Sequence, residues 1–377
     1  MNISYITTYN AEDVHQWSGL GYYIASALRQ QKADLDMVGD INIQVPKYYD
    51  FKSKIYGRLG KRFLPEREPR LVKQAARQAE SRIKLSTDII FSPSTIPLAY
   101  IKSNRPKVFY TDATFAGMID YYPFLTNICA ESIRHGNEVE QAALDSCSLA
   151  FYSSDWAARS AVENYNVNPA KVKVMPFGAN VDDSRVLSDI RAIVHKRDTT
   201  TCHLLFLGVE WERKGGNIAV EVARLLNENG LPTVLHVAGI PANVLHNKPL
   251  YIIDHGFISK HTVEGANKLC NLFNQCHFLL LPTRADCTPV VFPEANSFGM
   301  PCITTNTGGI SSVIKDDING KMFTLQTNAA EYAAYIHNQF LNYNAYQQLC
   351  LSSFNEYDTR LNWNASGCAI MDLLKAL

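Results

Sequence analysis

Residues 277–306, HFLLLPTRADCTPVVFPEANSFGMPCITTN, hold in one stretch the pattern that decides the fold. HFLLLP (277–282) is a continuous apolar run, which is typical of a parallel strand buried on both faces. A helix is expected to begin near Thr288–Val291, with Thr288 as its N-cap and Pro289 in its first position. PCITTN (301–306) is the next apolar strand. Strand, helix and strand in succession predict a doubly wound α/β sheet.

The same alternation runs along the whole chain, and the series occurs twice. Helical patterns separate the strands; one of them, residues 217–230, ends in the Asn-Gly expected at a helix C-terminus. In the first series the predicted strands are 3–8, 88–93, 107–112, 149–154 and 172–177, and in the second they are 203–208, 233–239, 251–256, 277–282 and 301–306. The alternation in Asp34-Leu35-Asp36 suits a further strand of the first series rather than a metal site.

A change of composition divides the two series at MPFGANVDDSRVLSD (175–189), where a strand end is followed by Pro, Gly and polar residues. We therefore predict two Rossmann-like domains, residues 1–180 and 181–355. Their strands are expected to point their carboxyl ends at a shared central cleft, because ligands of such sheets bind there. The amphipathic pattern near the end, within residues 356–377, predicts a final helix.

Composition limits the function classes. Lys plus Arg and Asp plus Glu each number 36, so the overall charge indicates no nucleic-acid partner. The nine cysteines are scattered without a C-x-x-C pair, which favours reduced thiols in a cytoplasmic protein over a disulfide framework or zinc site. Neither a signal peptide nor an apolar run long enough to span a membrane is expected.

One segment departs from neutrality. Residues 52–84 hold eleven Lys or Arg against three Glu, with apolar residues interleaved. This pattern predicts a contact with an anionic surface, either a membrane headgroup layer or an anionic acceptor. The alternative is a solvated helix face followed by a loop.

Two carboxylates flank the expected helix start in the opening stretch. Asp286 follows the strand, and Glu294 is expected one turn into the helix. Between them the helix N-terminus presents free N–H groups and the positive end of its dipole, which suits an anion. A nucleotide sugar fits this order, since the first acid could hold sugar hydroxyls, the amides the diphosphate and the second acid the ribose. The donor-binding residues expected in the loop are Cys287, Thr288, Pro289 and Val290.

Residues 203–325 resemble the donor domain of the retaining glycosyltransferases of family 4. The family pattern is an apolar strand, E-x7-E on a loop and helix, then a small-residue strand and Gly-Gly. Here it reads Asp286-x7-Glu294 followed by EANSFGMPCITTNTGGISSVI. The resemblance implies a GT-B fold, in which the C-terminal helix, about residues 356–377, packs back on the first domain.

The resemblance also implies roles for residues outside the opening stretch. In FLGVEWERKGGNIAVEVA (206–223), Arg213 and Lys214 stand where the family places the cations that bind the diphosphate and stabilise the leaving group. The nucleotide base is expected to meet the backbone around Phe257 and Ile258. In the first half, Gly19 lies in the family's glycine-rich loop. Asp112 ends a strand where many members carry a His, and is the candidate to contact the sugar or the acceptor.

The sequence departs from the family pattern at the first acid, which is Asp286 in place of Glu, and at the following Gly-Phe-Gly, which is Cys287-Thr288-Pro289 here. Sugar choice or catalytic geometry is therefore expected to differ.

The preferred interpretation is a retaining, metal-independent hexosyltransferase without a cofactor. It would move a sugar from a UDP or GDP donor to a hydroxyl of a glycan or lipid-linked acceptor, in the cytoplasm or at the inner face of the membrane. The alternatives are a nucleotide-sugar epimerase or hydrolase, a sugar phosphorylase, and a non-catalytic nucleotide-sugar-binding subunit. The catalytic candidates are Asp112, Asp286, Arg213 and Lys214.

Overall fold

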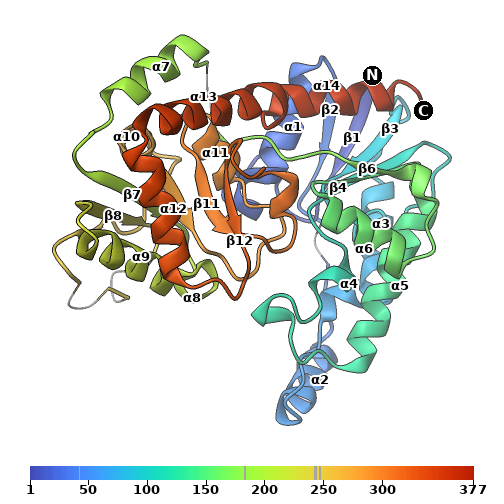
Figure 1. Cartoon of the computed structure of the whole chain (residues 1–377). Helices are drawn as coiled ribbons and strands as arrows, with labels where there is room; N and C mark the ends of the chain where they lie inside the picture. Colours follow the sequence, from blue (N-terminus) through green and yellow to red (C-terminus); the bar gives the residue numbers. More distant parts are fainter. Residues whose placement is uncertain (42, 182–183, 242–243, 246–247) are drawn as a thin grey trace. The chain divides into compact units, whose positions relative to one another are not determined.

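The computed structural model describes residues 1–377 except 42, 182–183, 242–243 and 246–247. The chain forms two compact units, unit 1 from Met1–Pro176 with Trp363–Leu377, and unit 2 from Phe177–Asn362. Figure 1 shows sheets with flanking helices in both units. Within the described ranges, none of the helices combines the length and apolar character needed to cross a bilayer.

Unit 1 is built on a six-stranded sheet in the order β2-β1-β3-β4-β5-β6, with all neighbours parallel. Its strands are β1 (Asn2–Ile6), β2 (Asp34–Val38), β3 (Ile89–Ser92), β4 (Lys107–Thr111), β5 (Leu149–Tyr152) and β6 (Val172–Val174). Its helices of four or more residues are η1 (Gln16–Gly19), α1 (Leu20–Gln30), α2 (Lys47–Arg58), α3 (Pro69–Glu80), α4 (Phe115–Met118), α5 (Ala130–Ser146), α6 (Asp155–Asn164) and α14 (Trp363–Leu374).

Unit 2 has a second six-stranded parallel sheet, in the order β12-β11-β10-β7-β8-β9. Its strands are β7 (Cys202–Leu207), β8 (Thr233–Ala238), β9 (Ile252–Asp254), β10 (Phe278–Leu281), β11 (Cys302–Thr305) and β12 (Gly320–Phe323). Its helices of four or more residues are α7 (Leu187–Lys196), α8 (Trp211–Lys214), α9 (Gly216–Glu228), α10 (Val263–Gln275), α11 (Val291–Asn296), α12 (Ala329–Leu341) and α13 (Tyr343–Arg360). Numbered from β7, the strand order is that of the Rossmann fold.

The apolar strands predicted from the sequence are all present, and the predicted α/β architecture is confirmed. Every residue of β10 is buried, as continuous apolar runs in parallel sheets require. Helix α9 ends at Glu228, and Gly230 follows with φ +83°, as its Asn-Gly pattern predicts. The short strand β12 was not among the predictions, because its residues GKMF lack an apolar run.

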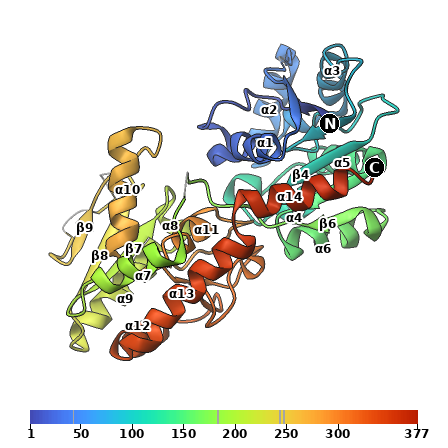
Figure 2. The same ribbon diagram turned by 90° about the horizontal axis from the view of Figure 1, so that it is seen from above.

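The chain returns to unit 1 through α14, which packs against α1 (Figure 2). A Cβ on Gly367 would lie 2.9 Å from the carbonyl oxygen of Ala27, so this glycine permits close helix packing. The boundaries between the units fall after Pro176 and after Asn362. The sequence analysis placed the first boundary after residue 180 and the return to the first domain at about residue 356. Residues 343–360 belong to unit 2 because α13 buries Tyr346 and Phe354 in the unit 2 core.

The basic segment 52–84 covers the end of α2, a loop and α3. The sequence analysis placed all apolar residues of this segment in one predicted contact surface, and the structure corrects this. Phe63, Leu71 and Val72 are buried in the cores of unit 1, whereas Ile55 and Leu59 are exposed. The helix α3 therefore uses its apolar residues for packing.

Candidate active site

Asp286 lies at the centre of a buried polar cluster beyond the carboxyl end of β10. Its Oδ2 is 2.8 Å from Nζ of Lys214, and its Oδ1 is 3.2 Å from a guanidinium nitrogen of Arg213. The hydroxyl of Thr283 donates to Oδ2 at 2.8 Å. Because Lys214 and Asp286 are only 8% and 7% exposed, water screens this ion pair weakly. The structure thus brings together three residues that the sequence analysis selected from separate segments.

Two glycines allow the cations to reach Asp286. Arg213 and Lys214 end the short helix α8 after β7, and Gly215 follows with φ +79°. A Cβ on Gly215 would lie 2.0 Å from the carbonyl oxygen of Pro282, so only glycine lets α8 approach the end of β10 this closely. A Cβ on Gly208 would lie 3.1 Å from Cγ of Lys214, which leaves room for the lysine stem.

Arg213 is held by more than the carboxylate of Asp286. It donates to the carbonyl oxygen of Ala285 at 2.6 Å and to Oε1 of Glu210 at 2.7 Å. The hydrogen bond from Arg213 holds the pKa of Glu210 below its usual range. The sequence analysis missed Glu210 and Thr283, since neither belongs to a motif and only their contacts reveal them.

The Asp286 loop is also tied to the glycine pair that follows β11. The backbone N–H of Gly309 donates to the carbonyl oxygen of Asp286 at 3.3 Å, and Gly308 adopts φ +54°. The Thr307 hydroxyl donates to the carbonyl oxygen of Arg284 at 3.4 Å. The Gly-Gly of the sequence pattern therefore supports the loop that carries the first acid.

Glu294 has its own cation. Its Oε1 is 2.8 Å from Nζ of Lys260, and Glu294 is 6% exposed. Lys260 lies between β9 and α10 and was missed, because an isolated lysine in a loop carries no pattern. Together the Asp286 and Glu294 pairs place charged groups of both signs beyond the carboxyl ends of the unit 2 strands, where ligands of such sheets bind.

The start of α11 differs from the prediction. The helix begins at Val291 with Val290 as its N-cap, and Val290 makes no side-chain capping hydrogen bond. Thr288 lies two residues before the N-cap, and its hydroxyl donates to the carbonyl oxygen of Cys287 at 2.7 Å. Pro289 consequently lies before the helix, and Pro293 takes the third helical position, where a missing N–H costs no helical hydrogen bond.

The base-contact candidates follow β9. Gly256 has φ +62°, and its carbonyl oxygen accepts a hydrogen bond from the N–H of Gly239 at 2.8 Å, which ties this segment to the end of β8. Phe257 is 74% exposed, and Ile258 packs against the unit 2 core.

Gly19 and Asp112 lie in unit 1, each beyond the carboxyl end of a strand. Gly19 has φ +83° and caps α1, and the preceding Trp17 and Ser18 also have positive φ, 45° and 55°. Left-handed backbone at two consecutive non-glycine residues is costly, and strain of this kind tends to cluster at functional sites. The glycine-rich pattern pointed to this loop but did not predict its strain. Asp112 directly follows β4 and is half-buried.

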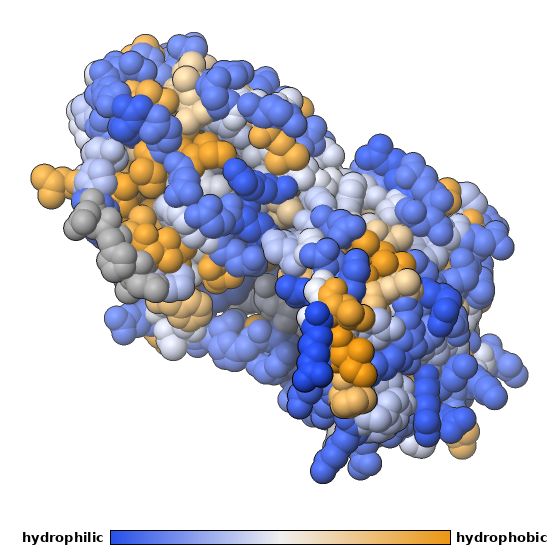
Figure 3. Space-filling model, turned by 90° about the horizontal axis from the view of Figure 1, so that it is seen from below, coloured by the Kyte–Doolittle hydropathy of each residue, from blue (hydrophilic) through white to orange (hydrophobic). Residues whose placement is uncertain are grey.

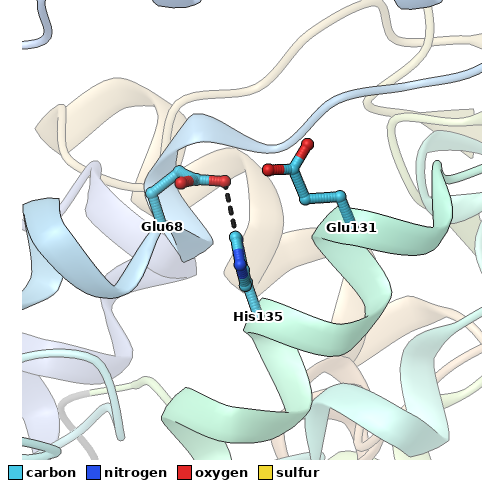
Figure 4. A group of neighbouring side chains, drawn as sticks. All are labelled: Glu68, Glu131 and His135. Carbon is cyan, nitrogen blue, oxygen red and sulfur yellow. Dashed lines mark hydrogen bonds and ion pairs between the residues drawn. The ribbon is translucent and has the colours of Figure 1, made fainter.

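Among the described residues, one group has the spacing of a metal site. Ligand atoms of Glu68, Glu131 and His135 lie within 4.8 Å of one another (Figure 4). The ammonium of Lys52 is 2.6 Å from Glu131, however, and already supplies positive charge there. The Asp34-Leu35-Asp36 stretch lies on β2, and the Asp36 carboxylate there forms an ion pair with the Lys84 ammonium at 2.7 Å.

Comparison with known proteins shows which family the second half of the chain is similar to. The model of "Glycosyl transferases group 1" matches residues 191–350. A curated relative from Escherichia coli, UDP-Gal:alpha-D-GlcNAc-diphosphoundecaprenol alpha-1,3-galactosyltransferase, is 22% identical over 170 residues. That match spans 44% of each protein, so the chain covers less than half the length of this relative.

Solved structures match over the full chain. HepE from Anabaena, determined in complex with UDP and glucose, superposes with a TM-score of 0.65 at 14% identity and covers 100% of both chains. Sucrose-phosphate synthase from Thermosynechococcus elongatus gives a TM-score of 0.69 at 14% identity, covering 100% of this chain and 98% of its own. The lipopolysaccharide outer core galactosyltransferase WaaB gives 0.66 at 12% identity, with 100% of both chains covered. The family model therefore matches within unit 2, and the whole chain has the GT-B fold of these solved structures.

Proposed function

We propose that the chain is a retaining hexosyltransferase that moves a sugar from a nucleoside-diphosphate donor to a hydroxyl of a glycan or lipid-linked acceptor. The observation that carries the proposal is the buried cluster of Arg213, Lys214 and Asp286 beyond the carboxyl end of β10. Lys has three donors and Arg five, so both cations can bind a diphosphate while they stay paired with Asp286.

In this proposal the two cations stabilise the charge that develops on the departing nucleoside diphosphate. Asp286 binds sugar hydroxyls, and Glu294, oriented by Lys260, binds the ribose. The bond from the anomeric carbon to the phosphate oxygen breaks as the bond to the acceptor oxygen forms on the same face. The acceptor proton passes to the leaving phosphate oxygen. Because protein cations supply the positive charge, the reaction proceeds without a metal ion.

Three further roles complete the proposal. The backbone at Phe257 and Ile258 contacts the nucleotide base, Gly19 allows the backbone of its loop to approach the diphosphate, and Asp112 orients the acceptor hydroxyl. The relatives support UDP over GDP as the nucleotide. HepE was determined with UDP and with UDP-glucose, and the name of the Escherichia coli relative specifies UDP-Gal.

A thermal-shift panel of UDP, GDP, ADP and their sugars tests the donor site. A ligand at 100 times its Kd stabilises the native state by about 2.7 kcal/mol. UDP compounds should raise the melting temperature of the wild type and of Arg224→Ala, a control that removes an exposed cation of α9. Lys214→Met, which keeps most of the side-chain volume, should abolish the shift. An unchanged shift in Lys214→Met would contradict the proposed diphosphate site.

Turnover assays separate the chemical alternatives. The transferase should consume UDP-sugar only when an acceptor is added, and NMR of the product should show the anomeric configuration of the donor. Consumption without an acceptor would instead favour a hydrolase or epimerase. Binding without any turnover would favour a non-catalytic subunit.

A further inference from the structure

Helix α2 of unit 1 has an inward face that is fixed by specific contacts. The Lys52 ammonium and the Tyr56 hydroxyl bind the two carboxylate oxygens of Glu131 at 2.6 and 3.1 Å. The rings of Tyr49 and Tyr56 both stack on Phe63, with centroids 5.8 Å away. These contacts fix the rotation of α2 about its axis, so the sides of the helix that do not face Glu131 and Phe63 are held outward.

One of these outward sides, about a quarter turn from the inward face, carries a stripe of large apolar side chains. Tyr48, Phe51, Ile55 and Leu59 are 48%, 66%, 42% and 69% exposed. At about 100° per residue they fall within an arc of roughly 80° on the helix surface. A solvated helix normally presents polar residues there, so a contiguous apolar stripe indicates a contact with another apolar phase.

Basic side chains border this stripe. Lys47, Lys54 and Arg58 are exposed on the adjoining flank of α2, and Lys61 and Arg62 are exposed in the turn that follows. Figure 3 shows an apolar strip beside hydrophilic side chains on the face where α2 lies.

A neighbouring loop extends the apolar stripe. The Arg62 guanidinium donates to the carbonyl oxygen of Phe124 at 3.1 Å, and the Phe124 side chain is 54% exposed. Phe124 thus adds an exposed aromatic ring beside the basic turn.

We propose that α2, the turn through Arg62 and Phe124 form a docking surface for an anionic lipid bilayer. The apolar stripe would enter the boundary between headgroups and acyl chains, and the basic flank would lie against the anionic headgroups. Charge complementarity favours this occupant over a second copy of the chain, because two copies would bring two basic flanks together. The surface lies in unit 1 and involves none of the proposed donor residues, so it can fail while the proposed transfer activity stands.

Flotation with vesicles of phosphatidylcholine alone, and with about one third phosphatidylglycerol, tests the surface. The wild type should float with the anionic vesicles at low salt and remain unbound with the neutral ones. Lys54→Glu/Arg58→Glu should lower binding by at least about twentyfold, since each basic residue near the surface contributes about fivefold. Arg191→Glu/Lys196→Glu on exposed positions of α7 is the control for charge and should bind as wild type.

The apolar stripe has an equally close control. Phe51→Ser/Leu59→Ser should abolish flotation at every salt concentration, whereas Leu341→Ser, at a side chain that is also 69% exposed, should leave it unchanged. A urea unfolding midpoint close to that of the wild type, followed by circular dichroism, verifies for each variant that the fold is intact. Equal flotation of all variants, or a dimer in light scattering that Phe51→Ser/Leu59→Ser dissociates, would overturn the proposal.

Discussion

Replacing Asp286 by Asn tests whether the buried cluster has the energetics that its geometry implies. The substitution keeps the shape of the side chain and removes its charge. Arg213 would keep its contact with Glu210 at 2.7 Å. For Lys214, in contrast, Asp286 is the ion-pair partner recorded within the described part of the chain, and the lysine side chain is 11% exposed. The variant would therefore leave an uncompensated ammonium in a buried position.

The magnitude follows from this burial. Breaking a buried ion pair by removing one partner costs about 3–5 kcal/mol. Because Arg213 retains a carboxylate, we expect a loss near the lower end, about 3 kcal/mol in the unfolding free energy of unit 2. The double variant Lys214→Met/Asp286→Asn removes the orphaned charge, and it should lie within about 1.5 kcal/mol of the wild type.

Urea unfolding followed by 19F NMR of protein labelled with 5-fluorotryptophan measures this loss in unit 2 alone. The chain has four tryptophans, and Trp211 is the one within Phe177–Asn362. Its resonance therefore reports the folded fraction of unit 2. A cost below about 1 kcal/mol for Asp286→Asn, or a double variant no more stable than the single one, would refute the argument.

Three further predictions concern the same unit and its chemistry. Gly215→Ala should destabilise unit 2 far more than Gly230→Ala in urea unfolding, because both have positive φ but only the first Cβ would collide with Pro282. Burial lowers the pKa of His236 to about 4 and that of His277 to about 3, so the unfolded chain binds protons first as the pH falls below 6.5. The contribution of these two histidines to the unfolding free energy should therefore be complete above pH 6.5. Between pH 6.5 and 4 the unfolding free energy should fall by about 1.4 kcal/mol per pH unit for each histidine. A urea midpoint that does not change with pH would contradict this. Sugar transfer should persist in excess EDTA. A loss of activity that Mg²⁺ or Mn²⁺ restores would show that the charges of Arg213 and Lys214 do not suffice.

Local patterns were sufficient for most of the architecture. Runs such as HFLLLP are apolar because both faces of a parallel strand are buried, and this demand is visible in the residues themselves. The Asn-Gly after α9 likewise signals a left-handed helix end that few other residues adopt. The strand β2 was also anticipated, from the alternation in Asp34-Leu35-Asp36, whereas β12 lacks an apolar run and was missed.

Local sequence patterns predicted only part of the candidate site. Arg213, Lys214, Asp286 and Glu294 could be selected because each belongs to a motif with a known spacing. The pairing of Lys214 with Asp286, and of Lys260 with Glu294, joins residues 72 and 34 positions apart and depends on how the strands are ordered in the sheet.

Tertiary structure also decided which side of each element faces out. Basic and apolar residues are mixed throughout 52–84, but Leu71 and Val72 are buried whereas Ile55 and Leu59 are exposed. Periodicity locates an apolar stripe on a helix, but it does not say whether the rest of the chain covers that stripe. Coverage depends on contacts between distant segments, and only the folded chain brings those segments together.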